Sequence, residues 1–350
     1  MATVVGAFMF AASGFYNVSA LKRHYVVVER AIQFALNRSI STHSTGDAPN
    51  NLDDENLIRL GARHFQLGCA PCHGMPSGDG NPIMQEMYPA PPDLSHAASK
   101  WDAAELGWII QNGVKFTGMP AWAGLHRQDE IWPLVAFLQY LPSEEVYADT
   151  IGGLASPTAD ETTPADRASL CVACHGDGQR LPVSDKVPSL SGQTAAYLRR
   201  SLFDYRADRR QSGMMEPIAA ALDDQAIERL AAHFSAQKVP KDIAGTAQNG
   251  IERGRRIAVS GQPDAHLPPC LSCHGSSGSD RFPRLGGLSR QYILGQLRLF
   301  QSGVRSESGF AAIMSTVAQR LTPEQMEDVA TYFAAADRPV RETASSRMGR

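Results

Sequence analysis

The chain has 350 residues, of which 43% are hydrophobic and 20% charged, and its formal net charge is −3. These values are ordinary for a globular protein, and the length suggests two or three domains. No basic stretch or motif indicates nucleic-acid binding, so we expect no nucleic-acid partner.

The charges are unevenly distributed along the chain. Residues 1–44 sum to +3, residues 45–150 to −9, residues 151–242 to −1 and residues 243–350 to +4. A charged stretch is often simply a solvent-exposed face with no role in binding. Opposite signs at the two ends also suit a protein whose surface field steers brief encounters with different partners. Both interpretations stay open.

The N-terminal segment is distinguished by an apolar run. Residues 4–20 contain no charged side chain, which is the short end of what a membrane helix needs. A cleaved signal ending at Ala20 and a buried helix are alternatives; we favour an anchor. Residues 25–40 have the spacing of an amphipathic helix that lies on a membrane or on a partner subunit. We therefore expect residues 1–44 to form a membrane-associated helical segment, with contact through residues 1–40.

Residues 45–150 predict a first helical domain. The expected helices are residues 57–65, 102–113 and 130–138. Gly61 and Phe65 lie one turn apart on the first of these and suit a close crossing with the last. We expect Pro133 in the first turn of the last helix, where a proline is tolerated.

Residues 151–242 and residues 243–337 predict a second and a third helical domain. The helices expected there are residues 197–202, 226–234, 292–297 and 325–333. Thr322 followed by Pro-Glu is a helix-start signature. Residues 142–165 are rich in Pro, Ser, Thr, Gly and acids and predict a linker. Residues 338–350 predict a disordered basic tail.

The pattern Cys-x-x-Cys-His occurs three times and uses all six cysteines. The copies are Cys69-Ala-Pro-Cys72-His73, Cys171-Val-Ala-Cys174-His175 and Cys270-Leu-Ser-Cys273-His274. This is the attachment signal of haem c, in which two thiols bind the vinyl groups and the histidine ligates the iron. We therefore expect three covalently attached haem c groups, in domains that lie outside the cytoplasm.

Structural zinc and a thioredoxin-like thiol pair are the alternatives for a single motif. A zinc site needs four ligands, usually from a second Cys or His pair nearby, whereas the three motifs lie about a hundred residues apart. A redox thiol pair does not require a histidine after the second cysteine in every copy. The threefold repeat therefore favours haem.

Each haem iron needs a sixth ligand or keeps an open site. In the second and third domains a methionine lies 40 residues after the motif histidine and opens a similar sequence; in the first it lies 46 residues after, in a Gly-Met-Pro loop. The axial pairs that we predict are His73 with Met119, His175 with Met215, and His274 with Met314. Met214 is an alternative to Met215. His96 and His126 flank the first methionine loop and are further alternatives.

A Pro-x-Leu sequence falls between the motif and the methionine in every copy, at Pro92, Pro188 and Pro283. A proline fixes the chain in an extended turn. We expect its carbonyl oxygen to accept the free ring N–H of the motif histidine, a contact that sets the tautomer of the ligand.

These elements follow one another as a helix, the motif, a Pro-x-Leu loop, a methionine loop and a closing helix. In this order residues 50–337 resemble three class I cytochrome c domains in tandem. The second and third together resemble the two-domain diheme cytochromes c of bacteria. The first resembles monohaem domains fused to, or encoded with, respiratory oxidases and dehydrogenases. The resemblance implies an all-α fold and a triheme cytochrome c that relays single electrons in a respiratory chain.

The partners that this resemblance implies are a respiratory membrane complex and a redox carrier protein, on the periplasmic side of the bacterial inner membrane. Ligation by His and Met raises the reduction potential, which favours a haem–copper terminal oxidase as the acceptor. A cytochrome subunit of a periplasmic dehydrogenase complex is the alternative. A haem enzyme such as a peroxidase would need an open iron site, against which the three methionine candidates argue.

Overall fold

The computed structural model describes residues 2–75, 80–141, 164–239, 248–275 and 277–336. These residues form helices joined by loops, and their only β-type pairing is an isolated bridge between Gln262 and Leu267. The predicted all-α fold is therefore confirmed. The predicted tail and most of the predicted linker at 142–165 lie outside the described residues, and the domain boundaries stay predictions.

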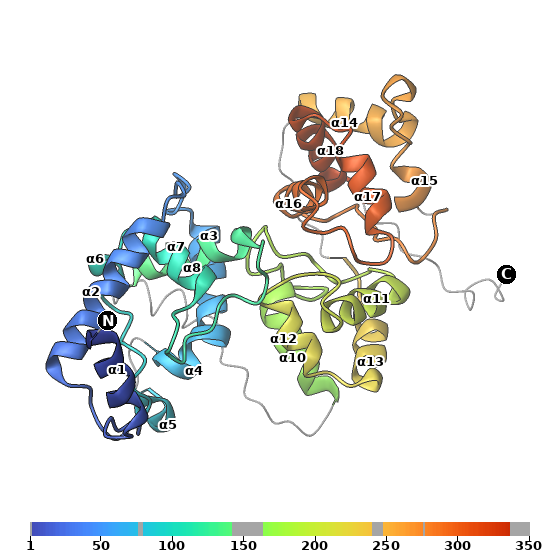
Figure 1. Ribbon diagram of the computed structural model, residues 1–350. Coiled ribbons are helices and arrows are strands. Elements are labelled where there is room, and N and C mark those ends of the chain that lie inside the picture. The colour runs from blue at the N-terminus through green and yellow to red at the C-terminus, as the bar shows by residue number, and fades with distance from the viewer. Residues whose placement is uncertain (1, 76–79, 142–163, 240–247, 276, 337–350) are drawn as a thin grey trace.

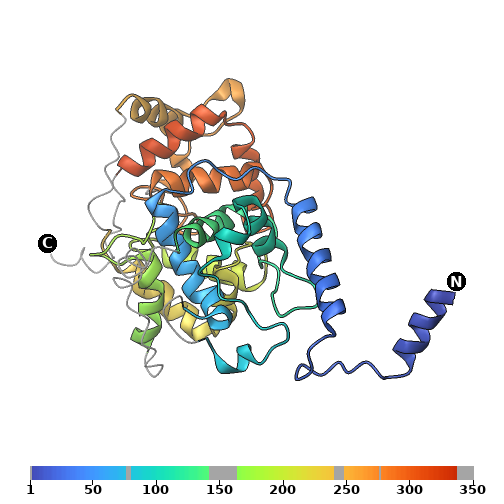
Figure 2. The same cartoon turned by 90° about the vertical axis from the view of Figure 1, so that its left-hand side faces the viewer.

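The apolar run at residues 4–20 does not form one continuous helix. Helix α1 spans Ala2–Ala12 and is followed by Gly14, whose φ of 70° is left-handed and ends the helical hydrogen bonding. Helix α2 spans Val26–His43, as expected for the amphipathic segment, and buries Ile40. Figure 2 shows α1 projecting away from the other helices. No helix among the described residues is both long and apolar enough to cross a membrane.

The first helical unit is built around α3 (Glu55–His64) and α8 (Gln128–Tyr140), which cross closely. Its other elements are a π-helical turn (Phe65–Cys69), α4 (Ala70–His73), α5 (Pro82–Gln85), α6 (Ala97–Lys100) and α7 (Ala103–Asn112). The crossing predicted from Gly61 is confirmed, since a Cβ there would lie 1.8 Å from the carbonyl oxygen of Pro133. The placement of Pro133 was wrong. Helix α8 begins two residues earlier than predicted, so Pro133 lies inside it.

The last three helices of the second unit and of the third unit repeat one arrangement (Figure 1). The second contains α10 (Pro164–His175), α11 (Ala195–Arg206), α12 (Met215–Ala220) and α13 (Asp224–Ser235). The third contains α14 (Gln248–Ser260), a 3-10 turn (Pro263–Ala265), α15 (Leu271–His274), α16 (Arg290–Gln301), α17 (Ala311–Ala318) and α18 (Pro323–Ala335). Each unit has its own hydrophobic core. The predicted helices fall within α11, α13, α16 and α18, and Thr322 caps α18 as its sequence indicates.

Equivalent residues of the second and third units contact each other reciprocally. Thr194, the N-cap of α11, donates from its hydroxyl to the carbonyl oxygen of Asp280. Ser289, the N-cap of α16, donates in the same way to the carbonyl oxygen of Asp185. Thr194 and Ser289 each lie six residues after the proline of their Pro-x-Leu sequence. The two units therefore meet about a pseudo-twofold axis, as the subunits of an isologous dimer do.

Gln193 and Arg284 form a paired hydrogen bond within this contact. The Gln193 side chain donates to the carbonyl oxygen of Arg284 over 2.7 Å and accepts from its backbone N–H over 2.9 Å. Both residues are buried, so removing either bond leaves a polar group without water.

His64 is buried in the first unit, where its Nδ1 lies 3.2 Å from the carbonyl oxygen of Glu130. Burial, with Arg127 acting in the same direction, lowers the pKa of His64 from 6.5 to about 4. The folded state therefore favours the neutral ring. The stability that neutral His64 contributes is fully present above 6.5, its pKa in the unfolded chain. It is lost as the pH falls toward about 4, its pKa in the folded protein.

We expect acidification from pH 7.5 to pH 5 to destabilise the first unit by about 2 kcal/mol through His64 alone. Tryptophan fluorescence during denaturation measures this, because all four tryptophans, at positions 101, 108, 122 and 132, lie in this unit. His64→Gln keeps a donor and removes the titration, so it should flatten the pH dependence. An unchanged slope in that variant would contradict the assignment.

Candidate haem sites

The three motif histidines share one hydrogen bond. Nδ1 lies 2.8 Å from the carbonyl oxygen of Pro92 in His73, 2.8 Å from that of Pro188 in His175, and 2.9 Å from that of Pro283 in His274. A carbonyl oxygen only accepts, so Nδ1 carries the proton and Nε2 keeps its lone pair. The contact predicted for each proline is present, and it leaves each ring ready to ligate a metal through Nε2.

The motifs lie at the ends of helices. α4, α10 and α15 all end at the motif histidine. Gly74 and Gly176 follow with φ of 75° and 67°, a left-handed conformation that a residue with a Cβ adopts only with strain. Helical spacing within the motif brings the thiols and the imidazole to one side of the chain.

The six cysteines form no disulfide with one another and are partly buried. Burial raises the pKa of Cys69 to about 12, and that of Cys171 and Cys270 to about 11 each. Among the described residues no cluster of three or more His, Cys, Asp or Glu side chains could hold a metal ion.

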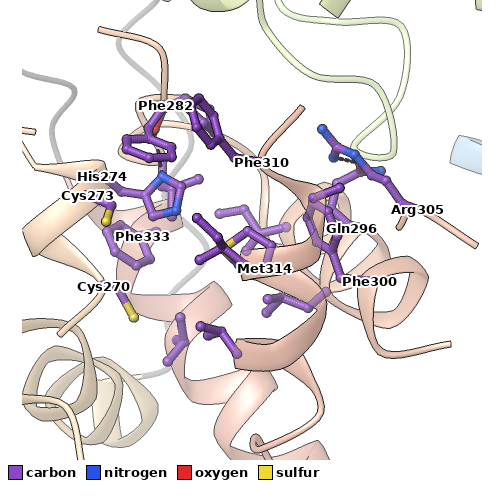
Figure 3. Close-up of a pocket in the computed structure, with 18 of the residues that line it drawn as sticks. Cys270, Cys273, His274, Phe282, Gln296, Phe300, Arg305, Phe310, Met314 and Phe333 are labelled. Atoms are coloured by element: carbon purple, nitrogen blue, oxygen red, sulfur yellow. Dashed lines mark hydrogen bonds between the residues drawn. The ribbon is translucent and has the colours of Figure 1, made fainter. Parts of the chain in front are cut away.

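The third unit contains a largely apolar cavity beside its motif. It encloses about 1200 Å³ of space, which includes open solvent at its mouth. Figure 3 shows Cys270, Cys273 and His274 along one side of it, with Met314 facing the imidazole and the rings of Phe282 and Phe310 next to each other. Burial lowers the pKa of His274, which keeps the ring neutral. Thiols, an imidazole and a thioether around an apolar space suit a covalently bound porphyrin.

The other two predicted methionines lie in comparable segments. Met119 follows Gly118 in a turn, where its backbone N–H donates to the Thr117 hydroxyl over 3.1 Å. Met215 is the first residue of α12, and Met214 is its N-cap. Met119, Met215 and Met314 are half-buried, whereas His96 and His126 are exposed. Iron ligation by the three methionines stays a prediction.

Sequence reasoning missed a partly buried basic cluster between the second and third units. Arg210 is 5% exposed and donates to the Tyr292 hydroxyl over 3.2 Å, and Arg200 and Arg305 are half-buried. Buried nitrogens of Arg200 and Arg305, which line the cavity, have no hydrogen-bond partner. The only local signal was the density of arginines between residues 199 and 210.

Within this cluster Arg200 has an ion pair with Asp204 over 3.9 Å. The guanidinium groups of Arg210 and Arg305, in contrast, donate hydrogen bonds to neutral side chains, those of Tyr292 and Gln296. Burial alone would raise the pKa of Tyr197, but the charges of Arg210 and Arg305 outweigh it and lower that pKa. A haem c carries two propionate carboxylates, and such anions would satisfy the unpaired guanidinium nitrogens. The residues present therefore fit the cofactor at both its vinyl and its propionate ends.

In comparisons with known proteins the chain matches cytochromes. Residues 56–138 match the family described as "Cytochrome C oxidase, cbb3-type, subunit III". The chain is 37% identical to cytochrome c-552 of Acidithiobacillus ferridurans, over 51% of this chain and 78% of the relative. It is 32% identical to the thiosulfate dehydrogenase electron acceptor of Stutzerimonas stutzeri, over 58% of this chain and 94% of the relative. A solved cytochrome c4 of Acidithiobacillus ferrooxidans aligns with a TM-score of 0.45 at 36% identity, over 48% of this chain and 99% of that one.

These relatives are matched over most of their own length, and their names describe electron carriers. Haem c is the cofactor that the three motifs hold by covalent attachment. The chain therefore belongs to the cytochrome c family and is an electron-transfer cytochrome.

Proposed function

We propose that the chain relays single electrons within a respiratory chain to a haem–copper terminal oxidase. The observation that carries this is the match of residues 56–138, around the first motif, to a cbb3-type oxidase subunit. The bound haem c groups supply one-electron exchange at iron. The protein supplies attachment, ligand orientation and exclusion of water, and no catalytic residue.

The residues that we propose for this role are the six motif cysteines, the three prolines at 92, 188 and 283, and three axial pairs. The pairs are His73 with Met119, His175 with Met215, and His274 with Met314. The prolyl carbonyls support the assignment, because each orients one imidazole. We further propose that residues 45–150, 151–242 and 243–337 are three cytochrome c domains of a triheme chain.

A second candidate function is that of the cytochrome subunit in a periplasmic dehydrogenase complex. It is favoured by the relative described as a thiosulfate dehydrogenase electron acceptor. In that role electrons would enter from substrate oxidation and leave through a redox carrier protein.

Rapid mixing separates the two functions. The reduced full chain is mixed with membranes that contain a cbb3-type oxidase, and the absorbance of reduced haem is followed. Oxidation that cyanide abolishes, and that membranes without the oxidase do not cause, supports the proposal. In the second arm the oxidised chain is mixed with thiosulfate and a thiosulfate dehydrogenase. Reduction in that arm alone would favour the alternative, and no exchange in either would overturn both.

We also propose that residues 1–40 associate with a membrane or a membrane subunit on the periplasmic side. The apolar side chains of α1 support this. Val4, Val5, Phe8, Met9 and Phe10 are each more than half exposed, and an apolar surface of this kind marks an interaction site. A variant that lacks residues 1–40 should leave the membrane fraction and keep its haem. Retention there would place the contact elsewhere.

A further inference from the structure

The segment directly before Met215 is held by the first unit. Arg127, at the start of α8, donates from Nη1 to the carbonyl oxygen of Gln211 over 2.6 Å. The Glu130 carboxylate accepts from the Ser212 hydroxyl over 2.6 Å and from the Gly213 backbone N–H over 2.7 Å. Contacts between residues more than 80 positions apart thus converge on residues 211–213. This places the first and second units side by side (Figure 1).

Glu130 is organised for this contact. It is 8% exposed, and Arg127 Nη2 lies 2.8 Å from its Oε1. The Trp122 indole N–H donates to its Oε2 over 3.1 Å. A buried carboxylate with this many donors is held in one orientation. Two of those donors, Ser212 and Gly213, belong to the second unit.

One further hydrogen bond connects this network to Met215. The Ser212 hydroxyl donates to Glu130 and accepts from the backbone N–H of Met215 over 3.1 Å. Two hydrogen bonds therefore separate the first unit's carboxylate from the backbone of the methionine. Ser212 thus connects Glu130 to the first residue of α12.

Close packing supports the same junction. A Cβ on Gly213 would lie 2.2 Å from the Trp122 indole, so the ring lies directly on the glycine. Trp122 comes three residues after Met119. The segments that carry the first and second predicted methionine ligands thus contact each other across the junction.

The pseudo-equivalent segment of the third unit has different neighbours. The Arg200 guanidinium of the second unit lies 5.1 Å from the centre of the Phe310 ring, shortly before Met314. The cross-unit hydrogen bonds of Arg127 and Glu130, in the part of the chain that is described, lead to the second unit. Docking of the first unit thus makes the two pseudo-symmetric sites unequal.

We propose that Glu130 is a positioning residue for the methionine segment of the second unit, and that it sets the reduction potential of the second haem apart from that of the third. The inference rests on the proposed ligation by Met215. It assigns a specific role to the first unit: besides carrying its own haem, it fixes the ligand segment of its neighbour.

Spectroelectrochemical titration of the full chain tests this. In Glu130→Gln an NH₂ group replaces one of the two carboxylate oxygens. Because that group donates, it cannot accept the hydrogen bonds that the oxygen accepted. We expect the equilibrium constant for reduction of one haem to change about tenfold while those of the other two stay the same. For a one-electron couple this is a shift of about 59 mV in the midpoint potential of that haem. Ser212→Ala should change the same haem without a change in charge, and Ser212→Thr should restore it. Asp129→Asn is the matched control, because it removes a charge beside Arg127, and the side-chain hydrogen bonds and ion pair of Asp129 in the described part of the chain go to Arg127 and not to residues 211–213.

Met215→Leu, measured beside these variants, identifies the second haem and separates two kinds of failure. If it leaves the methionine–iron charge-transfer band intact, the ligand assignment is wrong. If it removes part of that band while Glu130→Gln and Ser212→Ala behave as Asp129→Asn does, Met215 is the ligand and the positioning role is overturned.

Discussion

Replacing Met119, Met215 or Met314 by leucine is expected to remove about a third of the near-infrared thioether-to-ferric-iron band in each case. A leucine side chain cannot coordinate, so one of three irons loses its sixth ligand. Replacement by histidine should lower the midpoint potential of the affected haem by a few tenths of a volt, on the order of a third of the ~0.8 V range that axial ligands span. Near-infrared spectra of the oxidised chain and a redox titration measure both effects.

Two methionines provide the controls. Met326 is 2% exposed in the core of the third unit, so Met326→Leu should leave both the band and the potentials unchanged. Met214→Leu tests the neighbour of the second ligand. If it reduces the band while Met215→Leu does not, the ligand of the second haem is Met214.

Gly61→Ala is expected to destabilise the first unit by about 3 kcal/mol, at the upper end of what overpacking costs. The added Cβ would lie 1.8 Å from the carbonyl oxygen of Pro133 and 2.8 Å from the Phe137 Cβ, so α3 and α8 would have to move apart. Both partners are buried and neither is the end of a flexible side chain. The tryptophan-monitored denaturation midpoint should fall.

Gly254→Ala is the matching change in the third unit, where a Cβ on α14 would lie 2.0 Å from the carbonyl oxygen of Asp328 on α18. Its effect should appear in the haem absorbance of the third unit more than in tryptophan fluorescence. Gly295→Ala is the control, since nothing lies within 4 Å of the added atom. If Gly61→Ala and Gly254→Ala each lower the free energy of unfolding by less than about 1 kcal/mol, the crossing helices move apart at little cost and the expectation is wrong.

The features that the sequence predicted well are local or repeated. The proline–histidine contacts connect residues 9 to 19 positions apart and recur in three copies, so spacing alone identified them. Gly61 was recognisable because a glycine on a buried helix face indicates a close approach. Spacing cannot test iron ligation, which depends on where each sulfur lies relative to an iron atom.

The features that the sequence did not predict connect distant parts of the chain. Nothing in the sequence around Glu130 distinguishes it from other polar residues of a helix, because its partners Ser212 and Gly213 lie 82 and 83 positions away. The contact of Arg210 with Tyr292 is likewise not indicated by any local sequence pattern. For the N-terminal run we favoured a membrane anchor over a cleaved signal and a buried helix, because the run contains no charged side chain; the backbone conformation at Gly14, which hydrophobicity does not reveal, ends α1 within it.

The reciprocal contacts of Thr194 and Ser289 give the second and third units the contact pattern of a homodimer within one polypeptide. In a true homodimer every substitution appears twice, so both halves must change together. Here each half can acquire substitutions separately while the shared contact surface is retained. The covalent connection also fixes the ratio of the halves at one to one and keeps them at an effective concentration that dilution does not alter. Such a pair remains assembled at the low concentrations at which a dimer of separate subunits would dissociate.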